Sequence, residues 1–265
     1  MWRGLYIAGS GMITETNRTD VIANNIANAA SSGYKRDEAV HREFAPMLLR
    51  RINDTQDEKI TSVKQFRLEQ GAPAVGILGL GSYTDEIVTD HAQGAFLSTG
   101  NTYDVAIAGE GFFAVETPQG VRYTRDGSFY RQTDGTLVTS KGYLVLNERN
   151  RPINIPEARQ SVAIGGAGEI MVDGALIDTL AFVQFDSPRA AVKQGDNLYV
   201  PREGAQPQAA TGSIQQGLLE RSNVNIASEM VNLIHNYRIY EAGSKAVTTQ
   251  DSMADKAVND VGRIS

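Results

Sequence analysis

The chain has 265 residues, of which 41% are hydrophobic, and a formal net charge of -6 at pH 7. This length can bury a core in one or two domains, while the negative charge and the lack of a Lys/Arg stripe argue against a nucleic-acid-binding protein. The sequence contains no Cys, which excludes disulfides and cysteine metal sites, and no apolar run approaches the roughly 18 residues of a membrane span.

The N-terminal segment predicts a helix over residues 4–30. Apolar side chains recur in one register at Leu5, Ala8, Met12, Ile22, Ile26 and Ala29. Glu15 and Thr19 interrupt that register, so this seam is less regular than the one at the other end of the chain.

Three asparagines lie near the end of the first helix, at Asn24, Asn25 and Asn28. Asn is a poor helix former, and a buried amide without partners costs about 1 to 3 kcal/mol. We therefore expect a neighbouring chain to supply hydrogen-bond partners. Gly33 suits a left-handed helix stop, and Tyr34 begins an extended segment.

Residues 37–75 are a variable connecting segment. The apolar-basic piece at residues 44–52 predicts a helical turn, and the polar run 53–70 predicts a loop. Residues 76–102 are expected to be an extended linker that contains a strand at 83–90.

Residues 103–202 predict a β domain, because short apolar runs alternate with glycine turns such as Asp126-Gly127 and Asp134-Gly135. The candidate strands are 105–107, 111–116, 121–125, 129–132, 136–139, 143–146, 162–164, 170–172, 180–185 and 198–201. Many short antiparallel strands indicate a barrel-like or irregular β unit. Residues 203–225 are expected to be the return linker.

The C-terminal segment, residues 226–265, predicts a long helix with a heptad seam. The seam positions are Ile226, Met230, Leu233, Tyr237, Tyr240, Ser244, Val247, Asp251, Ala254, Val258 and Val261. Residues 222–225 offer side-chain oxygens for an N-cap, and Glu229 suits the first turn. The predicted fold class is thus α+β, with two long terminal helices that form a coiled-coil-like stalk and an inserted, mostly antiparallel, barrel-like β domain.

The two helical seams are narrow and bury little area at roughly 25 cal/mol per Å². A lone hairpin of these helices would be marginal, so further copies of the chain are expected to supply the missing contacts. The alternative is a secreted or envelope binding module in which the helices pair within one molecule.

The sequence carries no recognisable catalytic, metal-binding or cofactor-binding motif. His41, His91 and His235 lack metal-ligand spacing. A glycosidase-like carboxylate pair, which would suit a cell-wall hydrolase, could come from Asp104, Glu110, Asp126 and Asp134. Asp126 and Asp134 each precede a turn glycine, however, where Asp is explained by its side-chain hydrogen bond to the backbone. We expect no catalytic residues, no metal and no cofactor.

Several long motifs resemble the bacterial flagellar basal-body rod and hook family, and in detail its proximal and distal rod types. They are ANNIANAASSGYKR at 23–36, YDVAIAGEGFF at 103–113, YTRDGSF at 123–129, ERSNVN at 220–225 and MVNLI at 230–234. The ending KAVNDVGRI at 256–264 is similar to hook-basal-body proteins of Gram-positive bacteria.

This resemblance implies a structural subunit of the rod, the drive shaft that transmits torque to the hook. It implies that residues 1–36 and 226–265 form the axial core, and that the partners are other copies, neighbouring rod or hook proteins and the flagellar type III export apparatus, with no nucleic acid and no small-molecule substrate. The N-terminus lacks a secretory h-region, so export to the basal body without a cleaved signal is expected.

The residues predicted to pack against other subunits lie in both terminal segments. They are Leu5, Met12, Ile22, Asn24, Asn25, Ile26, Asn28, Gly33, Tyr34, Ile226, Met230, Leu233, Tyr237, Tyr240, Val247 and Val258.

Overall fold

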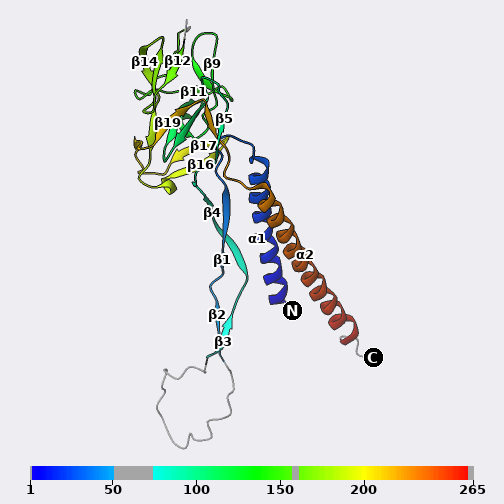
Figure 1. Ribbon diagram of the computed structural model, residues 1–265. Helices are drawn as coiled ribbons and strands as arrows, with labels where there is room; N and C mark the ends of the chain where they lie inside the picture. Colours follow the sequence, from blue (N-terminus) through cyan, green and yellow to red (C-terminus); the bar gives the residue numbers. More distant parts are fainter. Residues whose placement is uncertain (1, 51–73, 157–160, 262–265) are drawn as a thin grey trace, which may run out of the picture. The chain divides into compact units, whose positions relative to one another are not determined.

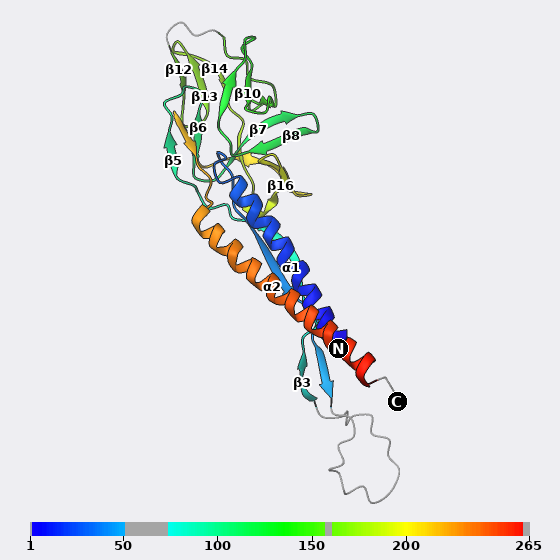
Figure 2. The same cartoon turned by 90° about the vertical axis from the view of Figure 1, so that its right-hand side faces the viewer.

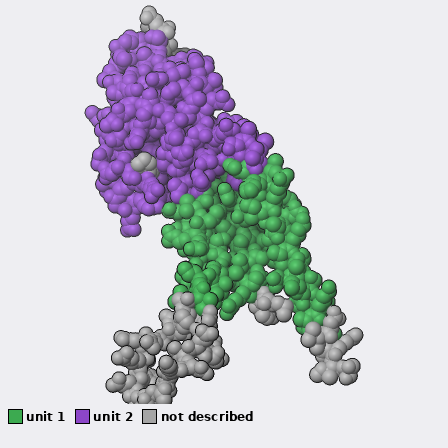
Figure 3. Space-filling model, turned by 60° about the horizontal axis from the view of Figure 1, so that its bottom comes forward, with its two compact units in different colours: residues 1–21, 39–87, 232–265 green, residues 22–38, 88–231 purple. Residues whose placement is uncertain are grey.

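The structure is a computed structural model that describes residues 2–50, 74–156 and 161–261. The chain divides into two compact units (Figure 3). Unit 1 comprises residues 1–21, 39–87 and 232–265, and unit 2 comprises residues 22–38 and 88–231. The fold is α+β, as the sequence predicts.

Two long helices lie near the ends of the chain: α1 (Trp2–Ala27) and α2 (Ile226–Lys256), the latter followed by a π-helical turn at Ala257–Val261. Neither sequence contains proline, which would break the backbone hydrogen-bond ladder. Asn225 caps α2, since its Oδ1 accepts a hydrogen bond from the Ser228 amide at 3.1 Å. The helix predicted at 4–30 agrees with α1 to within three residues. The helix predicted at 226–265 begins at Ile226 as expected, but its α-helical part ends at Lys256, its last described turn is π-helical, and residues 262–265 lie outside the described residues.

In unit 1 the helices α1 and α2 run side by side in opposite directions (Figures 1 and 2). A Cβ at Gly4 would lie 3.1 Å from the Gln250 side chain, and one at Gly243 would lie 2.9 Å from Met12 Cγ. Asn236, which is 1% exposed, donates to the Glu15 carbonyl at 2.7 Å and to Thr19 Oγ1 at 2.6 Å. Small and polar residues therefore make this helix contact.

The heptad seam of α2 does not coincide with the face that meets α1. Leu233 and Val247 are half-buried, whereas Met230 and Tyr237 are 50% and 67% exposed. The contact with α1 is made by Asn236, Gly243 and Gln250, which lie beside the predicted seam on the helix. Within one chain, therefore, α1 and α2 do not pair as a coiled coil through the whole predicted seam.

Unit 1 also contains most of two antiparallel ribbons. Strand β1 (Asp37–Glu43) pairs with β4 (Ser82–Thr89), and β2 (Met47–Arg50) pairs with β3 (Ala74–Leu78). The predicted strand at 83–90 is confirmed by β4. The helical turn predicted at 44–52 is wrong, because residues 47–50 pair with a strand more than 20 residues further along the chain. The polar run 53–70 lies outside the described residues.

The largest sheet of unit 2 has the strand order β16-β17-β8-β7-β11-β10-β9, and β15 pairs with both β7 and β18. Its strands are β7 (Phe112–Thr117), β8 (Gly120–Thr124), β9 (Phe129–Arg131), β10 (Leu137–Thr139), β11 (Leu144–Val145), β15 (Phe182–Gln184), β16 (Ala191–Gly195), β17 (Leu198–Pro201) and β18 (Gln208–Ala209). Every pairing among them is antiparallel. A short 3-10 helix, Pro188–Ala190, precedes β16.

Smaller sheets complete unit 2. They are formed by β12 (Val162–Ile164), β13 (Glu169–Val172) and β14 (Ala175–Thr179), by β6 (Val105–Ala108) with β19 (Ser213–Gln216), and by β5 (Phe96–Ser98) with β20 (Leu218–Glu220). Among the described strands no sheet closes on itself, so the barrel-like prediction is wrong. The two end strands of the largest sheet, β16 and β9, do not pair with each other.

The core of unit 2 is built by alternate side chains of these short strands. Its fully buried members include Val105, Ile107, Phe113, Val115, Phe129, Leu137, Ile153 and Ile170. A second cluster around Phe112, Tyr123 and Tyr199 packs on the other side of β7, since neighbouring residues of a strand face opposite ways. The strand predictions at 105–107, 111–116 and 198–201 are thereby confirmed.

Candidate assembly site

Unit 2 holds a buried cluster of three charged side chains. Glu220, at the end of β20, accepts a hydrogen bond from Lys35 Nζ at 2.6 Å on Oε1 and from Arg125 Nε at 2.7 Å on Oε2. All three side chains are at most 6% exposed. We call this cluster the ion network. Burying a charge is costly unless it is paired and hydrogen-bonded, and here each charge has a partner.

Backbone groups complete the ion network. The Gly94 amide donates to Glu220 Oε1 at 2.8 Å, Lys35 Nζ donates to the Ala92 carbonyl at 2.8 Å, and Arg125 donates to the Gly111 carbonyl at 3.0 Å. Burial alone would raise the pKa of Glu220, but the charges of Arg125 and Lys35 outweigh it and hold that pKa below its ordinary value. The carboxylate is therefore kept ionised.

The ion network fixes the segment that follows α1. The Gly33 amide donates to the Glu220 carbonyl at 2.7 Å, and Gly33 has a φ of 64°. A Cβ at this position would lie 2.4 Å from the Arg125 carbonyl oxygen. The left-handed conformation predicted for Gly33 is confirmed, but its role as a helix stop is not, because α1 ends at Ala27 and Gly33 lies six residues further on. The close approach of Arg125 gives glycine a second reason to be there.

A second polar cluster surrounds Tyr34, which is 3% exposed. Its hydroxyl donates to Asn24 Oδ1 at 2.8 Å, and Lys193 Nζ lies 3.6 Å from the centre of its ring. Lys193 also pairs with Asp37 at 2.8 Å. Burial, followed by the charge of Asp37, raises the pKa of Tyr34.

The amides predicted to need a neighbouring chain find their partners within this one. Asn25 Nδ2 donates to the Asp37 carbonyl at 2.7 Å, and its Oδ1 accepts from the Asp37 amide at 2.9 Å. Asn28 Nδ2 donates to the Asn24 carbonyl at 2.9 Å. Asn25 therefore needs no hydrogen-bond partner from another chain, because the chain turns back after Gly33 and brings the Asp37 backbone to it, and Asn28 bonds to the preceding turn of α1. The packing of these residues against another subunit stays a prediction.

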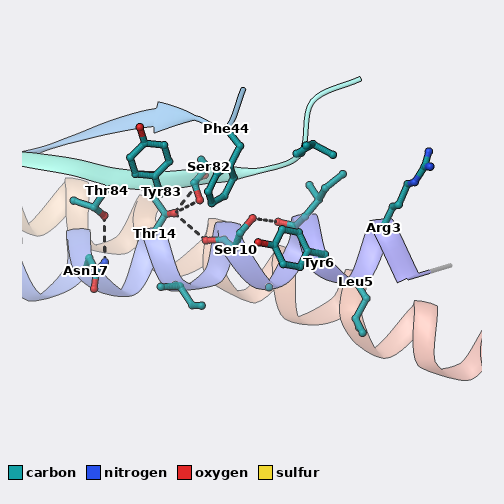
Figure 4. Close-up of a pocket in the computed structure, with 14 residues that line it drawn as sticks. Arg3, Leu5, Tyr6, Ser10, Thr14, Asn17, Phe44, Ser82, Tyr83 and Thr84 are labelled. Atoms are coloured by element: carbon teal, nitrogen blue, oxygen red, sulfur yellow. Dashed lines mark hydrogen bonds between the residues drawn. The ribbon is translucent and has the colours of Figure 1, made fainter. Parts of the chain in front are cut away.

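Unit 1 contains a groove of about 830 Å³ between α1 and β4 (Figure 4). The rings of Tyr6, Phe44 and Tyr83 follow one another along it, with centroids 6.4 and 5.1 Å apart. Tyr6 and Ile13 are 62% and 66% exposed. We call the surface lined by Tyr6, Ile13, Phe44 and Tyr83 the aromatic groove.

Hydrogen bonds hold the floor of the aromatic groove together. Thr14 Oγ1 donates to the Ser10 carbonyl at 2.8 Å and lies 3.1 Å from the Ser82 carbonyl, while Asn17 Nδ2 donates to Thr84 Oγ1 at 3.2 Å (Figure 4). These bonds join α1 to β4, so the groove is a fixed surface of unit 1.

The residues predicted to pack between subunits divide into two groups. Those that are buried or half-buried within the chain are Met12, Ile22, Asn25, Ile26, Asn28, Gly33, Tyr34, Leu233 and Val247, and those that are exposed are Leu5, Asn24, Ile226, Met230, Tyr237, Tyr240 and Val258. Among them Leu5 lines the same groove. Tyr6 and Ile13 also line the groove but are not among the residues predicted from the sequence, because they lie outside the chosen register although they share one helix face at a spacing of seven.

The residues weighed for catalysis have structural surroundings. Asp126 Oδ1 accepts from the amide and hydroxyl of Ser128, and Asp134 Oδ1 accepts from the Thr136 amide at 3.0 Å, which confirms the turn role predicted for both. In the described part of the chain no group of His, Asp and Glu is arranged to hold a metal, and neither helix is long and apolar enough to cross a membrane.

Fold and surface together define a class: α+β proteins in which two long terminal helices, with apolar side chains left exposed, flank an inserted antiparallel β unit. Three family models match the chain, namely flagella basal body rod protein at residues 5–35, flagellar hook protein FlgE/F/G D1 domain at 106–172 and flagellar basal body rod FlgEFG protein C-terminal at 215–260.

Curated relatives align over nearly the whole chain. The flagellar basal-body rod protein FlgG of Bacillus subtilis is 34% identical and covers 98% of this chain and 99% of its own length. FlgG of Agrobacterium fabrum is 35% identical over 95% and 97%, and FlgF of Caulobacter vibrioides is 32% identical over the full length of both. The chain belongs to the flagellar basal-body rod protein family. It is a structural subunit of the rod, and its place is the basal body of the flagellum.

The close approach at Gly33 gives a first prediction. Gly33→Ala must hold a left-handed backbone and also displace the Arg125 carbonyl, so we expect it to lower the free energy of unfolding by on the order of 3 kcal/mol. Gly100→Ala is the matched control, because Gly100 has a φ of 67° and nothing within 4 Å of its Cβ position; it should cost about 1 kcal/mol. Equal losses in urea unfolding would contradict this account.

The ion network gives a second prediction. Glu220→Gln leaves Lys35 and Arg125 buried without a counter-charge, and we expect a loss of about 3 to 5 kcal/mol at pH 7. Glu116→Gln, an exposed change on β7, should change stability by less than about 0.5 kcal/mol.

The pH dependence checks the same network. Since the pKa of Glu220 is lowered in the folded state, its contribution is present above the ordinary Glu value of about 4.3 and is lost as the pH falls below it. The loss of stability between about pH 5 and 3 should therefore be smaller in Glu220→Gln than in the unmodified chain. Identical pH slopes would show that Glu220 is not held ionised.

Proposed function

We propose that subunits of this protein stack through the exposed faces of α1 and α2 into the helical shaft that carries torque to the hook. The observation that supports this most is the apolar surface on both helices: Tyr6 and Ile13 on α1, and Met230, Ile234 and Tyr237 on α2, are each at least 50% exposed. Exposed apolar patches of this kind mark interaction surfaces. In a rod subunit, adjoining subunits would cover these apolar patches.

The partners follow from the same surfaces. Other copies of this chain and neighbouring rod or hook proteins would cover the terminal helices, which then pair with one another in a coiled-coil-like manner outside the contact that the chain makes internally. The protein would travel to this place through the flagellar type III export apparatus without a cleaved signal.

We also propose that the subunit has no catalytic role. The carboxylates of Asp126 and Asp134 act as hydrogen-bond acceptors of their own turns, and such use leaves them poorly placed as an acid and base pair. The ion network is likewise fully paired and buried. A network of this kind suits a role in holding the fold of unit 2 together.

Pairing of α1 with α2 inside one chain is also what a self-contained binding module would show. The two functions differ in what happens to the exposed faces: a rod subunit covers them by association, whereas a module remains a monomer. Sedimentation at rising protein concentration separates these cases, since only the rod subunit should shift to larger species.

A proline in the middle of α2 tests the proposal. Leu233→Pro removes a backbone hydrogen bond and kinks the helix at a cost of about 3 kcal/mol or more, so we expect loss of swimming and of incorporation into basal bodies. The core of unit 2 should remain folded by near-ultraviolet circular dichroism.

Ala227→Pro is the matched control for that variant. Ala227 lies in the first turn of α2, where backbone amides have no partner within the helix, and it is exposed. We expect this variant to swim and to incorporate normally. Normal motility of Leu233→Pro would refute a role for α2 in assembly.

A further inference from the structure

The aromatic groove is an apolar surface that the described part of the chain leaves open. Its exposed members Tyr6 and Ile13 lie on one face of α1, separated by seven residues, or about 10 Å along the helix axis at 1.5 Å per residue. Phe44 and Tyr83 line the same groove. Between the two α1 side chains stands Ser10, which is small enough to admit a side chain from a partner.

The same chain carries a second apolar surface of matching length. Met230, Ile234 and Tyr237 of α2 are 50%, 57% and 67% exposed, and their spacing of four and three places them on one helix face. Met230 and Tyr237 are also seven residues apart. We call these three residues the α2 stripe. Its face differs from the one through which Asn236 and Gly243 meet α1.

We propose that the aromatic groove of one subunit receives the α2 stripe of a second copy of this chain. This inference rests on the proposed function and names the contact that carries it. The helices run antiparallel, so that Tyr6 faces Tyr237, Ser10 faces Ile234 and Ile13 faces Met230. The four residues of the groove meet three large side chains with no charge among them.

Charge at the end of the contact agrees with that direction. Arg3 lines the groove one turn before Tyr6, and Glu241 lies one turn beyond Tyr237 on the face of the α2 stripe. In the antiparallel register these two opposite charges come together at the rim. A parallel arrangement would instead bring Arg3 towards the start of the stripe, where no acidic residue shares its face.

The register distinguishes this contact from the one within a chain. Inside one subunit Met12 of α1 lies against Gly243 of α2, whereas the proposed contact sets Ile13 against Met230. The α2 helix of the partner is thus displaced by about twelve residues, on the order of 18 Å at 1.5 Å per residue. A contact between different surfaces with an axial displacement cannot close on itself and produces a filament.

Paired cysteines test the contact directly, because the chain has no Cys of its own. The variant with Ile13→Cys and Met230→Cys replaces the natural copy in the bacterium, and isolated basal bodies are oxidised and run on a non-reducing gel. We expect a ladder of dimers and larger multimers. A mixture of the two single-cysteine chains should stop at the dimer, since each such chain can form one bond.

The control pair is Ile13→Cys with Ile239→Cys. Ile239 is 39% exposed and lies on a different face of α2 from the stripe, so this pair should remain monomeric. Incorporated Ile13→Cys/Met230→Cys subunits that cross-link no more than the control overturn the proposed contact. If a tagged subunit without the cysteine substitutions were absent from basal bodies, this would instead contradict the proposed function.

A charge exchange tests the register without cysteine. At low salt Arg3→Glu and Glu241→Arg should each weaken self-association about threefold to fivefold, and the double variant should restore it to within twofold, because the rim pair is reversed rather than lost. Lys245→Ala controls for the pair that Glu241 makes within its own helix, at 2.8 Å, and should leave association unchanged. A double variant as weak as the singles overturns the antiparallel register.

Discussion

The carboxylate of Glu220 is the point on which the organisation of unit 2 depends. It is buried between Lys35 and Arg125, with Oε1 and Oε2 each committed to one cation, and any one of the three charges would be costly to bury alone. The pairing requires three segments of chain to arrive together: the turn after α1, the end of β8 and the end of β20. The backbone conformation of Gly33 is part of the same arrangement, because no larger residue leaves room for the Arg125 carbonyl.

The two long helices use different residues for the contact within the chain and for the surface that they leave exposed. Where α1 meets α2 within the chain, the contact is made by Gly243, Asn236 and Gln250, which bury little apolar area. Met12 lies in that contact, but other large apolar side chains, such as Ile13 and Tyr237, are 66% and 67% exposed. A helix pair of this kind is held in place by hydrogen bonds and small residues, and its hydrophobic free energy remains available for association.

Local pattern predicted the helices, the strand β4 and the hairpin turns, because periodicity, capping and Asp-Gly pairs act over a few residues. It failed at residues 47–50, whose strand conformation depends on pairing with β3, and it assigned the partners of Asn25 to another chain although Asp37 supplies them. The ion network was out of reach, since Glu220 is separated by 185 residues from Lys35 and by 95 from Arg125. Its members nevertheless lie within the motifs that resemble the rod family, at 23–36, 123–129 and 220–225.

The position of Glu220 also sets an order of folding. Closing the loop from Lys35 to Glu220 costs entropy that only the finished contact repays, and contacts of such long sequence separation form late. Both α1 and α2 are tethered next to this tie, since Lys35 follows one helix and Glu220 precedes the other. A polypeptide that emerges from its N-terminus therefore cannot complete the ion network until residue 220 has emerged, so Lys35 and Arg125 obtain their common counter-charge only near the end of chain synthesis.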